Sequence, residues 1–351
     1  MTKKILLTGG IGYIGSHICV ALLEYGYEIS ILDSDIKNCS EIVKNISKIT
    51  ELNHKKFKQR ISLYEGDIRD KKILREIFLK LKNKGDKFSA VIHLAGLKSV
   101  SQSIKNPLDY WDVNVNGSIN LLKVMNEFCC KTIIFSSSAM VYGSKKDLKL
   151  DESLRLNPTN PYGLTKATVE KILETVFLSE LDYWKVCNLR YFNPIGAHFS
   201  GLIGEKLGLN GSNIFPLLNL VASGKKKLIK IYGNDWPTKD GTGIRDYIHV
   251  MDLAYGHVIA MEYLLSNKSQ QINLNIGSGQ GTTVLELIKI YQRVNNCSIP
   301  YEFCERREGD VGILVADNQL AKKILNWNPT RSIEEMCKDG WNWEKNQTKL
   351  S

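Results

Sequence analysis

Short apolar runs alternate with helix-like stretches over the first 190 residues of the chain. The runs fall at residues 3–7, 28–33, 61–67, 87–96 and 131–143, and stretches with helical spacing of apolar residues, such as 72–82 and 117–130, lie between them. Short apolar runs of this kind are typical of parallel strands that helices cover on both faces. The pattern therefore predicts an α/β fold built on a doubly wound parallel sheet.

The alternation stops near residue 193. Residues 193–214 are rich in Gly and Asn and have no clean period, which predicts long loops. A helix is expected at 250–265, and helix–strand alternation returns on a smaller scale over 282–345. We predict a sheet domain over 1–192, joined again by roughly 246–277, and a smaller C-terminal α/β domain over 193–351. The second domain is expected at the carboxyl edge of the sheet, where open α/β proteins bind ligands.

Four glycines follow the first predicted strand and open a helix. Gly9, Gly12 and Gly15 fit the spacing G-x-x-G-x-x-G, and Gly10 also gives the tighter G-x-G-x-x-G. Glycine at these positions permits a tight turn and the close approach of a pyrophosphate, which the amino end of the helix attracts. Asp33 ends the next strand, where its carboxylate would accept ribose hydroxyls and repel a 2′-phosphate. These features predict a Rossmann-type fold that binds NAD rather than NADP; the alternative is a glycine turn in a domain that binds no nucleotide.

A possible catalytic group follows from a tyrosine, a lysine and a serine. Tyr162 and Lys166 stand four residues apart on a predicted helix, and the serine run 136–138 ends the strand before it, at the expected position of a nicotinamide. The ordinary pKa of tyrosine is about 10, so a role as base near pH 7 requires that the phenolate be favoured by ~3 units. A neighbouring ammonium and a positive nicotinamide ring act in that direction. We therefore predict that Tyr162 and Lys166 are catalytic together with a serine of this run, although most Tyr–Lys pairs on helices are solvated surface features.

Composition narrows the class of protein further. Of the 351 residues, 43% are hydrophobic and 24% charged, as in an ordinary folded protein, and no apolar stretch approaches the ~18 residues that span a membrane. The net charge of +10 comes from scattered lysines, so neither a nucleic-acid partner nor a membrane is expected. The eight cysteines contain no C-x-x-C pair, and the histidines lack metal-like spacing. We expect free thiols, no metal and a cytoplasmic location.

Longer blocks of the sequence resemble the UDP-glucose 4-epimerase family, within the extended short-chain dehydrogenases/reductases. The blocks run in the family's order over nearly the whole chain, and GNDWPTKDGTGIRDYIHVMDLAYGH (233–257) is the most specific of them. The others are TGGIGYIGSH, EGDIRD, HLAGLKSV, NVNG, SSSAMVYG, NPYGLTK, LRYFNPIGAH and RREGDV. The resemblance implies that the first domain binds NAD and that the second binds a UDP-sugar.

The same resemblance implies roles for individual residues. Contacts to the cofactor would come from the glycine loop, the strand ends and the catalytic helix: Gly9, Gly12, Tyr13, Ile14, Gly15, Asp33, Asp67, Ile68, Leu94, Ala95, Gly96, Lys98, Asn114, Tyr162, Lys166 and Phe192. Ser138 would hydrogen-bond the 4-oxygen of the sugar. The uridine diphosphate would be held by Asn193, Asn213, Arg245, Arg307 and Asp310. Arginine forks suit phosphate oxygens, and Asp310 can accept ribose hydroxyls.

The family's reaction is the reversible interconversion of UDP-glucose and UDP-galactose in galactose metabolism. The resemblance implies oxidation at C4 to a 4-keto sugar with tightly bound NAD, rotation of the sugar, and reduction on its other face. It also implies a homodimer. Leu314 stands where a tyrosine excludes N-acetylated sugars and a cysteine admits them, so UDP-GlcNAc and UDP-GalNAc stay open, with a slight preference against them.

Three other functions fit the sequence less well than an epimerase does. A nucleotide-sugar 4,6-dehydratase would need an Asp–Glu pair after the active serine, where this chain has Ala139 and Met140. A UDP-glucuronate decarboxylase is disfavoured by the specific block at 233–257. A non-catalytic NAD sensor would be expected to have lost Tyr162 or Lys166, and both are present.

Overall fold

The computed structural model describes residues 3–36, 40–51, 60–144, 149–206, 213–307 and 310–350, with side chains up to Gln347. Cys39 and part of the expected loop at 193–214 lie outside these residues. The chain divides into two compact units: Met1–Gly143, Arg155–Arg190 and Ala254–Leu274 form the first, and Ser144–Leu154, Tyr191–Leu253 and Asn275–Ser351 the second.

The late segment of the first unit is shorter than the expected 246–277. Asn275 leaves the first unit because its side-chain amide donates to the backbone oxygens of Leu150, at 2.7 Å, and Asp317, at 3.2 Å, which both belong to the second unit. Residues 246–249 leave it because they belong to a strand that pairs within the second unit.

The first unit is built on a seven-stranded sheet. Its strands are β1 (Lys4–Thr8), β2 (Glu28–Asp33), β3 (Ile61–Glu65), β4 (Phe88–His93), β5 (Thr132–Ser138), β6 (Lys185–Tyr191) and β10 (Gln270–Ile276). They follow the order β10-β6-β5-β4-β1-β2-β3. The pairs β1–β2, β1–β4, β2–β3 and β4–β5 are parallel. The strand order runs outward from β1 in both directions, which confirms the predicted Rossmann-type sheet.

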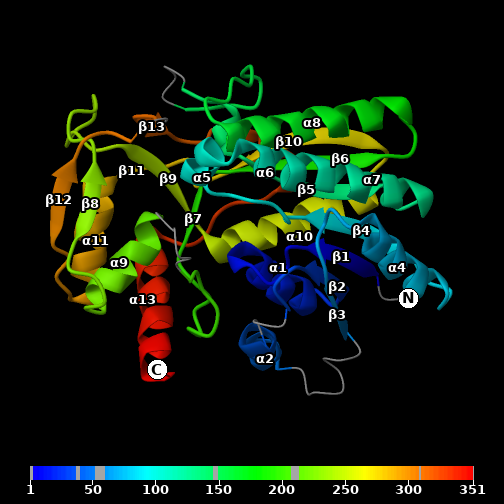
Figure 1. Ribbon diagram of the computed structural model, residues 1–351. Helices are drawn as coiled ribbons and strands as arrows, with labels where there is room; N and C mark the ends of the chain where they lie inside the picture. Colours follow the sequence, from blue (N-terminus) through cyan, green and yellow to red (C-terminus); the bar gives the residue numbers. More distant parts are fainter. Residues whose placement is uncertain are drawn as a thin grey trace. The chain divides into compact units, whose positions relative to one another are not determined.

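Helices cover this sheet in two groups (Figure 1). One group is α4 (Lys71–Lys82), α7 (Gly117–Glu127) and α8 (Pro161–Ser179); its buried core includes the strand residues Leu6, Leu32, Val91, Ile133 and Val186. The other group is α1 (Tyr13–Glu24), α2 (Ser40–Ile49) and α10 (Val250–Ser266). Between β4 and α7 lie α5 (Val100–Lys105), α6 (Pro107–Tyr110) and a π-helical turn, Trp111–Asn116.

The second unit holds two small sheets. In the larger one, β9 (Ile244–His249) pairs with β7 (Asn193–Ile195), β11 (Gly281–Thr283) and β13 (Ile313–Leu314). In the smaller one, β8 (Ile229–Tyr232) and β12 (Tyr301–Cys304) run parallel. The helices are α9 (Ile214–Ala222), α11 (Val284–Asn295), α12 (Gln319–Leu325) and α13 (Ile333–Leu350). Strand β7 corrects the expectation of loop throughout 193–214, since these three residues extend along β9.

Candidate active site

The loops after β1 and β4 meet at the centre of the seven-stranded sheet. The backbone amides of Leu94 and Ala95 donate to the backbone oxygen of Thr8 at 3.0 and 3.1 Å. The glycine loop that follows Thr8 therefore lies against residues 94–98. The strand order reverses at this point, and the crevice outside such a reversal is where open parallel sheets bind ligands.

The glycines of this loop divide into two kinds. Gly9 has φ +73°, and a Cβ there would lie 2.8 Å from the Ala95 backbone nitrogen; a Cβ on Gly15 would lie 2.2 Å from the Gly9 oxygen. Gly12 differs, because its φ is −64° and a Cβ would meet only the Gly9 oxygen, at an ordinary 3.6 Å. The packing of the chain requires glycine at 9 and 15, whereas at 12 the requirement would come from a pyrophosphate on the loop. The loop therefore fits a dinucleotide.

The start of α1 and the end of β2 complete this half of the site. Tyr13 and Ile14 are the first residues of α1, and the capping position before them, Gly12, has no side chain to accept their amides. The positive end of the helix dipole therefore faces the loop. The Asp33 carboxylate accepts the backbone amide of Ile11 through Oδ2 at 3.0 Å, which holds it beside the loop. This position suits the hydroxyls of an adenosine ribose.

Two residues after β3 were expected near the adenine. The Asp67 carboxylate is paired with Arg69, whose Nε lies 3.0 Å from Oδ1 and whose Nη2 lies 2.7 Å from Oδ2. These bonds hold the pKa of Asp67 below its usual range. Ile68 is buried, and a Cβ on Gly117 would lie 2.6 Å from its Cγ2. In this structure the Asp67 charge is thus engaged within the chain, and Ile68 packs against the start of α7.

Asn114 shapes the loop over residues 94–98. It is 3% exposed; its Oδ1 accepts the Leu97 amide at 2.7 Å, and its Nδ2 donates to Thr165 Oγ1 at 3.0 Å. A Cβ on Gly96, in the same loop as Lys98, would lie 2.9 Å from Asn114 Oδ1. Asn114 therefore acts through the loop that it supports, rather than as an open polar group.

The structure brings Ser138, Tyr162 and Lys166 together at the end of β5 and the start of α8. Pro161 begins α8, and Asn160 caps it by accepting the Gly163 amide at 2.8 Å. Ser138 hydrogen-bonds with Tyr162 through their side chains. Lys166 Nζ donates to the backbone oxygen of Ser136 at 2.7 Å, and it lies 6.0 Å from the centroid of the Tyr162 ring.

Burial sets the electrostatics of this group. It raises the pKa of the Tyr162 phenol to about 12, although the bond with Ser138 acts in the opposite direction. It lowers the pKa of the Lys166 ammonium to about 8, against the charge of Glu170. Lys166 is therefore still mostly charged at pH 7. In the chain alone burial outweighs the contributions that favour the phenolate, so Tyr162 is a neutral phenol at physiological pH.

His93 lies beneath the loops and has a structural role. It is 2% exposed, and its two ring nitrogens lie 2.7 Å from Thr8 Oγ1 and 2.9 Å from Ser118 Oγ. Burial lowers its pKa to about 3, so the ring is neutral at physiological pH. Within the described part of the chain, no group of three or more acidic, histidine or cysteine side chains could hold a metal ion.

Residues of the second unit that were expected to hold the nucleotide gather partly around β9. Leu314 of β13 is opposite Arg245 in the strand register and is 5% exposed. Asn193 of β7 is opposite Tyr247, and both the Asn193 Oδ1 and the Tyr247 hydroxyl are buried without a hydrogen-bond partner. These two polar atoms are therefore available to a ligand.

The other expected residues stand on different elements. The Arg307 guanidinium lies 3.8 Å from the centroid of the Tyr232 ring, at the end of β8, and the Asp310 amide donates to the Arg307 oxygen at 3.2 Å. Asn213 precedes α9, and its Nδ2 donates to Glu205 Oε1 at 2.8 Å. Phe192 is 7% exposed. Sequence reasoning missed Tyr232, although an aromatic residue directly before the specific block at 233–257 was a usable signal.

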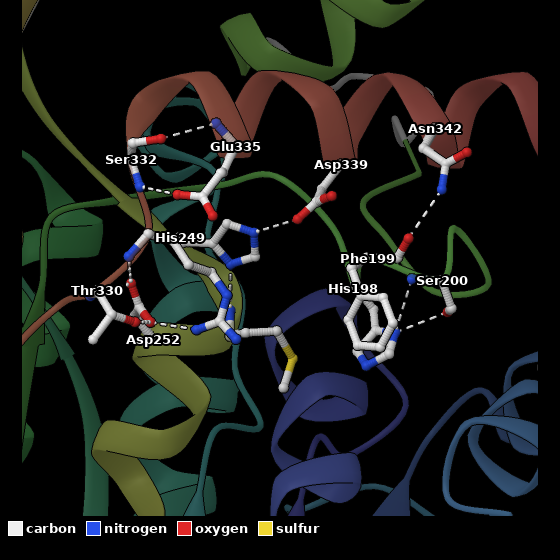
Figure 2. A network of polar contacts seen from close by, with 12 residues as sticks. His198, Phe199, Ser200, His249, Asp252, Thr330, Ser332, Glu335, Asp339 and Asn342 are labelled. Atoms are coloured by element: carbon white, nitrogen blue, oxygen red, sulfur yellow. Dashed lines mark hydrogen bonds and ion pairs between the residues drawn. The ribbon is translucent and has the colours of Figure 1, made fainter.

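Buried polar contacts anchor both ends of β9. Asp246 is fully buried and accepts the backbone amides of Ser278 at 2.7 Å and Gly279 at 2.9 Å. At the other end, His249 Nδ1 accepts the Met251 amide at 3.0 Å, so its Nε2 carries the proton and donates to Asp339 of α13 at 3.1 Å (Figure 2). Arg245 therefore projects from a rigid strand, and the contacts of His249 give it a structural role.

The segment at 198–200 and the residues after α12 extend the same network (Figure 2). His198 Nδ1 lies 2.8 Å from Ser200 Oγ, and burial lowers its pKa to about 4. The Asp252 carboxylate accepts the backbone amides of Thr330 and Arg331, both at 3.0 Å. The bonds to Asp252 tie the segment before α13 to the start of α10.

A glycine loop at the reversal point of a Rossmann-type sheet, with Ser138, Tyr162 and Lys166 beside it, defines a short-chain dehydrogenase/reductase. A family model described as GDP-mannose 4,6 dehydratase matches residues 6–340. The chain is 42% identical over 347 residues to UDP-glucose 4-epimerase 2 of Arabidopsis thaliana, covering 99% of this chain and 96% of the relative. It is 43% identical over 340 residues to UDP-glucose 4-epimerase of Bacillus subtilis (strain 168), covering 97% and 96%. The chain belongs to this family, within it to the UDP-glucose 4-epimerases.

Solved structures agree with this assignment. UDP-glucose-4-epimerase from Stenotrophomonas maltophila, with bound NAD and formylated UDP-arabinopyranose, has a TM-score of 0.92 at 38% identity and covers 99% of this chain and 100% of its own. UDP-glucose 4-epimerase from Bifidobacterium longum, in complex with NAD⁺ and UDP, has a TM-score of 0.90 at 38% identity and covers 99% of both chains. The resemblance seen in the sequence blocks is confirmed.

The family model is described as a dehydratase, but the residues after Ser138 do not fit dehydratase chemistry. Ala139 and Met140 follow Ser138 in a short helical turn, and the Met140 amide donates to Ser138 Oγ at 3.2 Å. Neither side chain can donate or accept a proton, so the acid–base pair that a 4,6-dehydratase places there is missing at these two positions.

Proposed function

We propose that this protein is an NAD-dependent UDP-glucose 4-epimerase that interconverts UDP-glucose and UDP-galactose. The proposal rests on the cluster of Ser138, Tyr162 and Lys166. It also rests on the glycine loop, in which packing does not require glycine at position 12 but a bound ligand would. Full-length relatives at 42% and 43% identity bear this name, and two similar structures contain NAD together with UDP or a UDP-sugar.

The cofactor would lie across the reversal point of the sheet. The glycine loop and the amino end of α1 would hold its diphosphate, Asp33 its adenosine ribose, and residues 94–98 its nicotinamide half. When bound there, NAD⁺ would supply the acceptor and donor for the C4 hydride and a positive charge near Tyr162. Because the oxidation is reversed within one turnover, the reaction has no net redox change.

Tyr162 acts as the base in this proposal. It takes the proton of the 4-hydroxyl during oxidation and returns it to the 4-oxygen during reduction, while Ser138 holds that oxygen. The Lys166 ammonium lies 6.0 Å from the centroid of the tyrosine ring. The positive charge of this ammonium acts in the direction that favours the phenolate. Lys166 therefore offsets part of the effect of burial on Tyr162.

The second unit would bind the nucleotide and leave the sugar free to turn. Arg245 and Arg307 provide guanidinium groups for the diphosphate, and Asp310 an acceptor for ribose hydroxyls. Asn193 and Tyr247 offer two buried polar atoms without partners. Anchoring at the diphosphate lets either face of the hexose approach the hydride, which epimerisation requires.

Leu314 favours sugars without an N-acetyl group. Its side chain is 5% exposed and stands opposite Arg245, so it occupies space beside a residue that we place at the diphosphate. We expect UDP-glucose and UDP-galactose to be the preferred pair, and UDP-GlcNAc and UDP-GalNAc to be poor substrates.

We also infer a cytoplasmic homodimer. Ile104, Leu108 and Leu164 are 43%, 79% and 45% exposed, on α5, α6 and α8, which pack against one another. Clustered exposed apolar side chains are typical of an interface. The cysteines of the described ranges are free, as a reducing compartment allows. Light scattering on the purified protein is expected to give twice the 39.7 kDa of one chain, and a mass of one chain would contradict the dimer.

None of the helices that the structure describes is long and apolar enough to cross a membrane.

The direct test is conversion of UDP-galactose to UDP-glucose by the purified protein without added cofactor, with Tyr162→Phe as control. Conversion by the wild type alone supports both the epimerase and a tightly bound cofactor. If no conversion occurs even with added NAD⁺, the proposal fails.

A further inference from the structure

Glu170 stands one turn beyond Lys166 on the same face of α8. Its Oε1 accepts a hydrogen bond from the Ser137 hydroxyl at 2.5 Å. Ser137 lies between the two β5 residues that contact Lys166 and Tyr162. Three successive turns of α8 are therefore each tied to the carboxyl end of the same strand.

The Glu170 carboxylate is buried with a cationic partner. Arg190 of β6 donates from Nη2 to Oε2 at 2.7 Å and from Nε to Oε1 at 3.0 Å, and the two side chains are 3% and 6% exposed, Arg190 first. Arg190 Nη1 also donates to the Tyr142 hydroxyl at 2.9 Å. Replacing a buried ion pair by apolar residues is often neutral or stabilising. Stability alone is thus a weak reason for two buried charges one helical turn from the active-site lysine.

We propose that Glu170 is a positioning residue of the reaction, which fixes α8 against β5 and keeps the buried Lys166 protonated. It acts through Lys166 and touches neither substrate nor cofactor. The inference rests on the roles proposed above for Tyr162 and Lys166.

Among the described ionisable groups around Lys166, Glu170 is the one whose charge stabilises the ammonium. On α8, Tyr162 is a neutral phenol at physiological pH, since burial raises its pKa to about 12. On β4, His93 is neutral, and on β6, Arg190 is paired with Glu170 itself. Among the described residues, Glu170 is the group whose charge opposes the effect of burial on the Lys166 pKa.

The size of this effect follows from helix geometry. Side chains four residues apart lie roughly 6 Å from each other. At an effective dielectric constant of ~20, removing a unit charge at that distance lowers the pKa of an ammonium by about 1–2 units. Glu170→Gln should therefore bring the Lys166 pKa from about 8 to near or below neutrality.

The experiment compares four proteins in the cofactor-bound state. They are the wild type, Glu170→Gln, the double variant Glu170→Gln/Arg190→Met, and Glu174→Gln. The double variant removes the risk of misfolding from an unpaired buried arginine. Glu174 is the matched control, because it is on the same helix but pairs with Lys171 at the surface, at 2.6 Å. Two readouts are taken: the pH profile of kcat, and the NMR titration of Lys166 labelled at its side-chain carbon, assigned with Lys166→Arg.

We expect the alkaline limb of the kcat profile and the lysine titration to move down by about 1–2 pH units in Glu170→Gln, to move down by less in the double variant, which also removes the positive charge of Arg190, and to stay in place in Glu174→Gln. A uniform loss of kcat with an unmoved limb and an unmoved lysine titration would overturn the proposal, because it would indicate a merely structural role. The NMR titration needs no substrate. A wild type that fails to convert UDP-galactose therefore refutes the proposed function, while the titration still decides the role of Glu170.

Discussion

Substituting alanine for Gly12 separates cofactor binding from folding. Gly12 has φ −64° and ψ 174°, which alanine also adopts, and the new Cβ would lie 3.6 Å from its nearest neighbour, the Gly9 oxygen. Gly15→Ala is the matched control in the same loop. Its Cβ would lie 2.2 Å from the Gly9 oxygen and 2.7 Å from the Gly10 Cα, so the backbone itself must move.

The expected magnitudes differ between the two variants. In Gly12→Ala, the lower entropy of the unfolded chain contributes ~0.4–1 kcal/mol, and the weaker capping preference of alanine offsets a similar amount. The unfolding free energy of the cofactor-free protein should thus change by less than about 1 kcal/mol. A methyl group over the loop would displace a pyrophosphate, and losing one or two charge-assisted hydrogen bonds, at ~1.5–3 kcal/mol each, weakens NAD binding at least tenfold. Gly15→Ala should lose ~1–3 kcal/mol of stability through overpacking.

Urea unfolding of the cofactor-free proteins and NAD titration by calorimetry measure both quantities. If Gly12→Ala folds stably but binds NAD more weakly, then glycine at position 12 is required for cofactor binding rather than for folding. If Gly12→Ala is destabilised as much as Gly15→Ala, or binds NAD like the wild type, the interpretation of this loop is wrong.

Three further predictions concern chemistry, pH and specificity. Tyr162→Phe should lose ~10²–10⁴-fold in kcat with its NAD content unchanged, measured by conversion of UDP-galactose and by absorbance of the released cofactor; near-normal kcat would exclude the tyrosine as base. His93 is neutral when folded, with a pKa of about 3, but protonates at about 6.5 when unfolded, so stability falls as pH falls through that window. Between pH 7 and pH 5, the unfolding free energy measured in urea should fall by ~2 kcal/mol less in His93→Gln than in the wild type. An equal fall in the two proteins would refute this. Leu314→Cys should raise kcat/KM for UDP-GalNAc ~10-fold or more, and an unchanged value would mean that this position does not limit the pocket.

Strands β1 to β5 of the first unit could be predicted because each falls in a short apolar run of the sequence, whereas β6 and β10 were not predicted. The run at 28–33 coincides with β2, and the helix expected at 250–265 differs from α10 by one residue. Strand β7 was missed because it has only three residues, one of them proline, and exists through pairing with β9 about 50 residues later. Sequence periodicity carries no information about such a pairing.

The candidate site could be predicted where local spacing places side chains together. Tyr162 and Lys166 are one helical turn apart, and Ser138 ends a strand. The pKa of Tyr162 could not be anticipated, because it depends on burial by the whole unit. Glu170 was missed for a related reason: a glutamate on a helix is usually solvated, and its burial depends on Arg190 from another strand. The available signal was Arg190, a charged residue in the largely apolar stretch directly before residues 192–194.

The epimerase mechanism makes one demand that alternative chemistries do not share. The hydride removed from C4 must return to C4, so UDP-glucose that carries deuterium at C4 should keep its label in both sugars. The purified protein, incubated with that substrate in ordinary water and analysed by NMR and mass spectrometry, is predicted to form UDP-galactose with deuterium retained at C4. Loss of the deuterium to solvent, or formation of a 4-keto-6-deoxy sugar, would contradict oxidation and re-reduction at C4 as the reaction of this protein.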